Sequence, residues 1–68
     1  MDDYCVNKSK QANGDHEVHK KGCIYWPSQA NVQSLGQHSN CSSAVRTARS
    51  HFTQVNGCKT CSTACHTQ

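Results

Sequence analysis

The cysteines limit what this chain can fold into more than any other feature of its sequence. Six of them stand in 68 residues, and only 34% of the residues are hydrophobic even when the cysteines are counted. Ordering the backbone costs about 1–2 kcal/mol per residue, and a chain this short rarely offsets that cost by apolar burial alone. Cross-links or a metal must therefore supply stability. The available thiols are Cys5, Cys23, Cys41, Cys58, Cys61 and Cys65.

Two short motifs have the spacing of metal ligands. Cys58 and Cys61 form a C-x2-C pair, in which a single turn presents two thiolates. The stretch HKKGC places His19 four positions before Cys23, and Gly22 lets the chain turn back between them. Zinc prefers four ligands of these types in a tetrahedron. The spacing predicts one zinc ion held by these four side chains.

The same motifs carry a family resemblance. HKKGC, followed by a helical stretch and then NGCKTC, resembles the H-x3-C and C-x2-C arrangement of small Ada-type metal-binding domains and of related modules attached to some nucleases. The similarity covers about residues 18–61. It implies that zinc is the metal, and that the ligands are His19, Cys23, Cys58 and Cys61.

Disulfide bonds are the alternative role for the thiols. An even number of cysteines in a short chain is typical of a stapled mini-domain, and spacing does not select one pairing. A zinc site would leave Cys5, Cys41 and Cys65, which is an odd number. We expect disulfide bonding to involve these three, and a mixed state would join Cys5 to Cys65 beside the zinc. If all six thiols were oxidised, Cys41 would form the central bridge.

The pattern of apolar residues predicts one small α+β domain spanning residues 1–68. Asn13 and Gly14 favour a hairpin turn between two β-compatible stretches. Pro27 ends any strand over residues 23–26, and the polar residues 28–40 indicate a long loop.

A helix is expected from about Cys41 to Val55, because apolar residues recur there every three or four positions. Ser39 or Asn40 would cap its start, and residues 56–57 would end it. We expect its apolar stripe to face Val18, Ile24 and Trp26 from the hairpin. The tail, CKTCSTACHTQ, is expected to form a cysteine-rich knuckle.

The charges suggest a partner but no catalysis. All four acids lie within the first 17 residues, so the rest of the chain is basic within a net charge of +3. Paired carboxylates around a cleft are not expected, nor is a catalytic triad, so we predict a non-enzymatic monomer. The expected partner is nucleic acid or an acidic protein. Its binding residues would be Lys20, Lys21, Arg46, Arg49 and Lys59.

The expected compartment depends on the chemistry of the thiols. No apolar run is long enough to span a membrane, and the first residues, MDDYCVNKSK, lack the features of a secretory signal. This favours a cytoplasmic protein, where thiols tend to bind metals. The alternative is a secreted, disulfide-stapled cationic peptide with an antimicrobial or toxin-like role.

Overall fold

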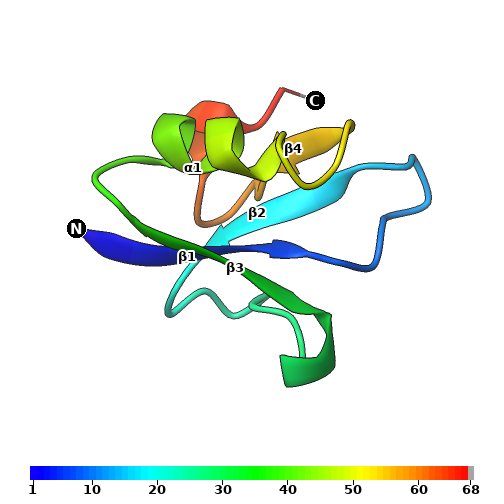
Figure 1. The fold of residues 1–68 in the computed structure, drawn as a ribbon, viewed down its shortest axis with the longest axis horizontal. Helices are drawn as coiled ribbons and strands as arrows, with labels where there is room; N and C mark the ends of the chain where they lie inside the picture. Colours follow the sequence, from blue (N-terminus) through cyan, green and yellow to red (C-terminus); the bar gives the residue numbers. More distant parts are fainter. Residues whose placement is uncertain (68) are drawn as a thin grey trace.

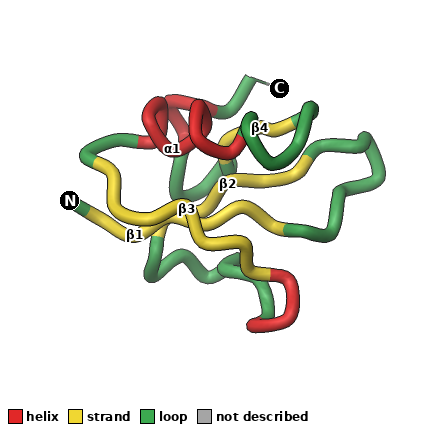
Figure 2. The backbone as a smooth tube through the Cα atoms, viewed as in Figure 1, coloured by secondary structure: helices red, strands yellow, loops and turns green. Residues whose placement is uncertain are grey.

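A four-stranded sheet carries one helix on one of its faces in the computed structural model, which describes residues 1–67 (Figure 1). The strands lie in the order β3-β1-β2-β4. The elements are β1 (Asp2–Asn7), β2 (His16–Lys20), the 3-10 helix η1 (Gln29–Asn31), β3 (Val32–His38), α1 (Cys41–Ala48), β4 (Val55–Gly57) and the 3-10 helix η2 (Thr63–Cys65). The expected α+β class is confirmed (Figure 2).

The predicted N-terminal hairpin is formed by β1 and β2. The two strands pair antiparallel, with Cys5 opposite His19 and Val6 opposite Val18. Their connection is a longer loop than a two-residue turn: Gly14 adopts a positive φ of 93° there, and the side chain of Asn13 accepts a hydrogen bond from Asp15 N. Asn13 and Gly14 thus have the turn chemistry expected of them, inside a wider loop.

The two faces of the sheet have different roles because side chains alternate along a strand. Tyr4, Val6 and Val18 point to one face and form the apolar core with Leu35 of β3 and with the buried side of α1. Cys5 and His19 belong to the other face, and both are also buried. The hairpin is therefore covered on both sides, by the helix on one and by the cysteine-bearing loops on the other.

Helix α1 begins where the sequence predicts but ends earlier. Asn40 caps it by accepting a hydrogen bond from Ser43 N at 3.0 Å. The helix ends at Ala48, so the expectation of a helix to Val55 was wrong. The chain leaves the helix because Phe52 stacks on His16, with ring centroids 3.9 Å apart, and the following residues enter the sheet. These tertiary contacts outweigh the helical spacing of the apolar residues that continues to Val55.

Two other expectations about local structure were also wrong. The predicted loop over residues 28–40 contains η1 and strand β3, which pairs antiparallel with β1 through a register shift between Tyr4 and Cys5. Residues 21–26 form turns, and Ile24 is 82% exposed instead of lying under the helix. Trp26 is half-buried, and Lys21 Nζ lies 5.2 Å from its ring centroid.

Strand β4 gives the fold its least predictable feature. It runs parallel to β2, with Val18 paired with Gly57. Parallel neighbours end at the same edge of a sheet, so the residues that follow β2 and β4 emerge side by side. The tail then turns back, and η2 packs against α1 (Figure 1).

Candidate metal centre

The shared edge of β2 and β4 brings four candidate ligands together. His19 lies near the end of β2 and Cys23 in the turn after it, while Cys58 and Cys61 follow β4. A hydrogen bond from Cys58 N to Val18 O, 2.9 Å long, joins the two segments next to the cluster. The four residues predicted from the sequence are therefore the same four that the structure gathers.

The donor atoms of these residues lie close enough for one metal ion. All four, three Sγ atoms and one imidazole nitrogen, are within 4.8 Å of one another. The Sγ atoms of Cys23 and Cys58 are 3.9 Å apart, and Cys61 Sγ is 3.8 Å from His19 Nδ1. A tetrahedral zinc ion holds two sulfur ligands about 3.8 Å apart and a sulfur and a nitrogen ligand about 3.6 Å apart, from bonds of about 2.3 and 2.0 Å. The cluster has nearly these dimensions.

Tight turns present the cysteines to the site. In the first turn, Cys23 N donates to Lys20 O, and Gly22 adopts a φ of 99°, which favours glycine. In the second, Ser62 N donates to Cys58 O at 2.9 Å, which closes the turn that carries Cys61. Local backbone hydrogen bonds thus shape the turns that carry Cys23 and Cys61.

Backbone amides also point at the sulfur atoms. Lys20 N donates to Cys61 Sγ at 3.2 Å, and Tyr25 N donates to Cys23 Sγ at 3.4 Å. Such hydrogen bonds stabilise negative charge on sulfur. The backbone thus offers a hydrogen-bond donor to each of these two sulfur atoms.

His19 is oriented for coordination by a carboxylate on the far side of its ring. Its Nδ1 faces Cys61, whereas Nε2 on the far side of the ring lies 3.3 Å from Glu17 Oε1. Burial lowers the pKa of His19 below its ordinary value, and Glu17 opposes part of this shift. The imidazole is therefore neutral near pH 7 and can offer its Nδ1 lone pair. A carboxylate behind the ring is the usual support of a metal-binding histidine.

Cys5 lies near the cluster but is not one of its ligands. It is fully buried, opposite His19 in the hairpin, and has a free thiol. Burial, with a smaller contribution from the charges of Cys61 and Cys23, raises the pKa of this thiol to about 12. Cys5 is therefore a protonated core residue.

One disulfide bond is present, and its pairing corrects a prediction. Cys41 of α1 bonds to Cys65 of η2, with Cα atoms 6.2 Å apart. The predicted pairing of Cys5 with Cys65 was wrong, because Cys5 lies under the sheet on the metal side while Cys65 packs on the helix side. The bond ties the tail, and with it the Cys58–Cys61 turn, to α1.

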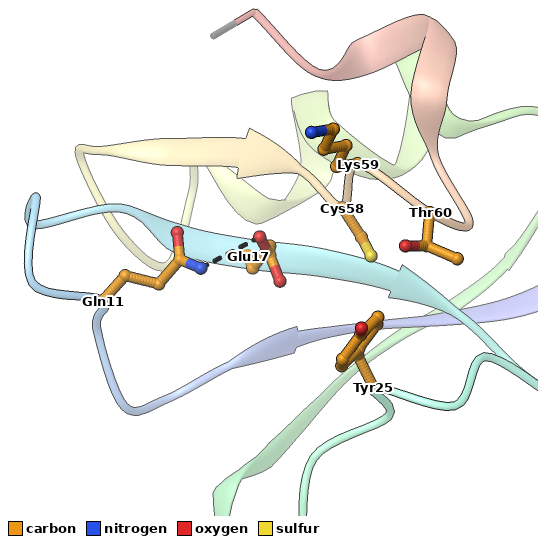
Figure 3. Close-up of a pocket in the computed structure, with 6 residues that line it drawn as sticks. All are labelled: Gln11, Glu17, Tyr25, Cys58, Lys59 and Thr60. Carbon is orange, nitrogen blue, oxygen red and sulfur yellow. Dashed lines mark hydrogen bonds between the residues drawn. The ribbon is translucent and has the colours of Figure 1, made fainter.

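A small open pocket lies beside the metal centre. It is bounded by the ligand Cys58, by Glu17, and by the exposed Tyr25 and Lys59 (Figure 3). The Glu17 carboxylate accepts a further hydrogen bond from Gln11 Nε2 at 3.1 Å. This pair of contacts fixes the carboxylate between the pocket and the histidine.

The predicted partner-binding residues are divided between two places. Lys20 and Lys21 adjoin the metal centre in sequence, and Lys59 lines the pocket beside Cys58. Arg46 and Arg49 instead line a groove between α1 and η2. No residue lines both hollows.

Sequence reasoning missed the role of Glu17 and the partner of Cys41. Glu17 stands two residues before His19 on a strand, so both side chains share one face. That spacing is a usable signal once the segment is known to be a strand. No comparable local signal exists for Cys41 and Cys65, whose separation is 24 residues.

No protein-family model, curated protein or solved structure matches the chain. Over residues 1–67, none of the helices is long and apolar enough to cross a membrane. The resemblance to Ada-type domains stays a prediction from the motifs.

Proposed function

We propose that this chain is a zinc-stabilised, non-catalytic binding module. The observation that carries the proposal is the cluster of His19, Cys23, Cys58 and Cys61, whose donor atoms lie within 4.8 Å of one another. A donor set of three thiolates and one imidazole favours zinc over the harder cations, which prefer oxygen ligands. Four protein ligands leave no open coordination position, which is typical of a structural site.

The arrangement of the chain also supports a structural role for the metal. The ligands come from two segments about 35 residues apart, so one ion joins the hairpin to the tail. The buried apolar side chains of the core are few and small apart from Tyr4 and Leu35. A domain of this size commonly needs a metal or disulfides in addition to its core. A distant relationship to Ada-type domains would have the same consequence.

The proposed partner is nucleic acid or an acidic protein. The basic residues that would meet it are Lys20, Lys21 and Lys59 beside the candidate metal site, and Arg46 and Arg49 at the C-terminal end of α1. Tyr25 is 59% exposed and lines the same pocket as Lys59, and an exposed aromatic ring in a pocket that also has a cation suits either a nucleobase or a protein surface. We propose a monomer as the binding form.

A second candidate is a secreted, disulfide-stapled cationic peptide. The Cys41–Cys65 bond is the observation that favours it, because disulfide bonds persist in oxidising compartments. The two candidates differ in what holds the fold. A chelator should unfold the zinc module, whereas a reductant should have the larger effect on a stapled peptide.

Counting thiols and metal tests the proposal directly. The purified protein should contain one zinc per chain. After denaturation with chelator but without reductant, alkylation should add four labels, one on each free thiol, and two more after reduction. A protein that binds no zinc, or whose cysteines all resist alkylation until reduced, would contradict the zinc module.

A further inference from the structure

Two of the four candidate ligands, Cys23 and Cys58, are also placed to bond to each other. Their Sγ atoms are 3.9 Å apart, although the residues are separated by 35 positions in the chain. A disulfide bond has a sulfur–sulfur length of about 2.05 Å, so a movement of about 1 Å by each sulfur atom would close the gap. The hydrogen bond from Cys58 N to Val18 O already holds the segment of Cys58 against β2, the strand that leads into the turn of Cys23.

The two thiols differ in exposure in the way that is typical of a pair that reacts with an oxidant. Cys23 is partly exposed in the turn after β2, whereas Cys58 is 2% exposed. Oxidation of a cysteine depends on its exposure and thiolate character, and a reactive cysteine often has a second cysteine beside it that resolves the product. Cys23 is therefore the sulfur that a small oxidant reaches first, and Cys58 is the neighbour that can complete a bond to it.

The other four thiols are less suited to a bond with Cys23. Cys41 and Cys65 are already bonded to each other. Cys5 is fully buried on the hairpin, opposite His19. Cys61 Sγ lies on the histidine side of the cluster, 3.8 Å from His19 Nδ1. The geometry therefore selects Cys58 as the partner.

We propose that Cys23 and Cys58 form a site of reversible oxidation, at which hydrogen peroxide converts their two thiolates into a disulfide bond. The Cys23 thiolate attacks one peroxide oxygen, so that a sulfur–oxygen bond forms, the oxygen–oxygen bond breaks and hydroxide leaves; the product is a sulfenic acid. The Cys58 thiolate then attacks the Cys23 sulfur, the disulfide bond forms and a second hydroxide leaves. The two sulfur atoms lose two electrons in total, the peroxide gains them, and both hydroxides take up protons from the solvent to become water.

This bond removes two of the four candidate metal ligands and leaves only His19 and Cys61. The inference rests on the proposed function as a zinc module, and it adds a condition under which the metal is released. The new bond joins the same two segments that the metal would join, so the domain should stay folded without zinc. A dithiol reductant would break the bond by thiol–disulfide exchange and return both thiolates to the site.

Addition of stoichiometric hydrogen peroxide to the zinc-loaded protein, with a zinc indicator dye present, tests the site. After denaturation, free thiols are blocked with one alkylating reagent, the disulfide bonds are reduced, and the released thiols are labelled with a second reagent. We expect the first label on Cys5 and Cys61, and the second on Cys23 and Cys58 in addition to the pair that is already bonded. One zinc ion should be lost for each new bond, and excess dithiothreitol with added zinc should restore the metal-bound form.

Two variants separate this bond from general oxidation of the protein. Cys5→Ala removes a buried free thiol outside the pair, so it should form the same bond and lose zinc as the wild type does. Cys23→His keeps a side chain that zinc accepts as a ligand but cannot form the bond. It should therefore retain its zinc at the peroxide concentration that releases zinc from the wild type.

The labelling of the wild-type protein decides the inference even where a variant does not fold. A zinc-loaded protein that forms no new disulfide bond, that bonds Cys58 to Cys61 instead, or that accumulates sulfinic acid at Cys23 without a bond overturns the inference, although the binding module then stands. A protein that contains no zinc before peroxide is added counts against the proposed function. Formation of the bond between Cys23 and Cys58 in that metal-free protein would still support the oxidation site.

Discussion

Replacing the candidate ligand Cys58 by serine should strongly destabilise this domain. A structural zinc site binds with an apparent free energy of about 10–16 kcal/mol in small peptides, whereas the core of a chain this size supplies no more than about 3–5 kcal/mol. The Cys41–Cys65 bond, with a separation of 24 residues, adds about 3.5 kcal/mol in the chain-entropy account. Core and disulfide together do not replace the metal. We therefore expect Cys58→Ser to lower the free energy of unfolding by more than about 3 kcal/mol, or about 12–24 °C in Tm.

Cys5→Ser is the matched control for this prediction. Cys5 and Cys58 are both buried, and both are free thiols. A buried serine hydroxyl without a partner costs about 1–3 kcal/mol at either position, but Cys5 is outside the ligand set. Thermal unfolding followed by circular dichroism, with and without chelator, measures stability, and the visible absorption of bound Co²⁺ reports thiolate coordination. If both variants lose equal stability and both bind Co²⁺ as wild type does, Cys58 is only a core residue and the reasoning fails.

Four further predictions test other parts of the structure. Glu17→Gln should weaken metal binding about 10–100-fold with the fold intact, because the support of His19 is weakened; competition with a chromophoric chelator measures this, and unchanged affinity would refute it. Cys5 should resist alkylation at pH 8 until the protein unfolds, since burial raises its pKa to about 12. As the folded pKa exceeds the unfolded value, stability should hold below about pH 8.5 and fall as pH rises toward 12, a slope that Cys5→Ala should reduce. Gly57→Ala should cost about 1–3 kcal/mol, because an added Cβ would lie within 2.8 Å of backbone atoms; an unchanged urea midpoint would contradict this. Ala48→Asp should prevent stable folding, because it buries an unpaired charge in the core. If the circular dichroism spectrum of this variant matched that of the wild type, Ala48 would not be packed in the core.

The cluster of candidate metal ligands could be predicted from the sequence because its information is local. Each ligand pair lies within one turn, and the residue types restrict the metal before any tertiary structure is known. The start of α1 is local in the same sense, since Asn40 caps the helix through a hydrogen bond three residues away. The hairpin likewise follows from Asn13 and Gly14 between two short strands.

Only the tertiary structure decided the features that depend on distant partners. Strand β3 has few apolar residues, and it forms because β1 offers an unpaired edge. Helix α1 stops at Ala48 because Phe52 stacks on His16. Cys65 pairs with Cys41 because η2 packs against the helix. Glu17 became recognisable as the support of His19 only when both were placed on one strand. In each case the free energy comes from contacts between segments far apart in the chain, and neither the spacing nor the propensity of either segment records which partner it will meet.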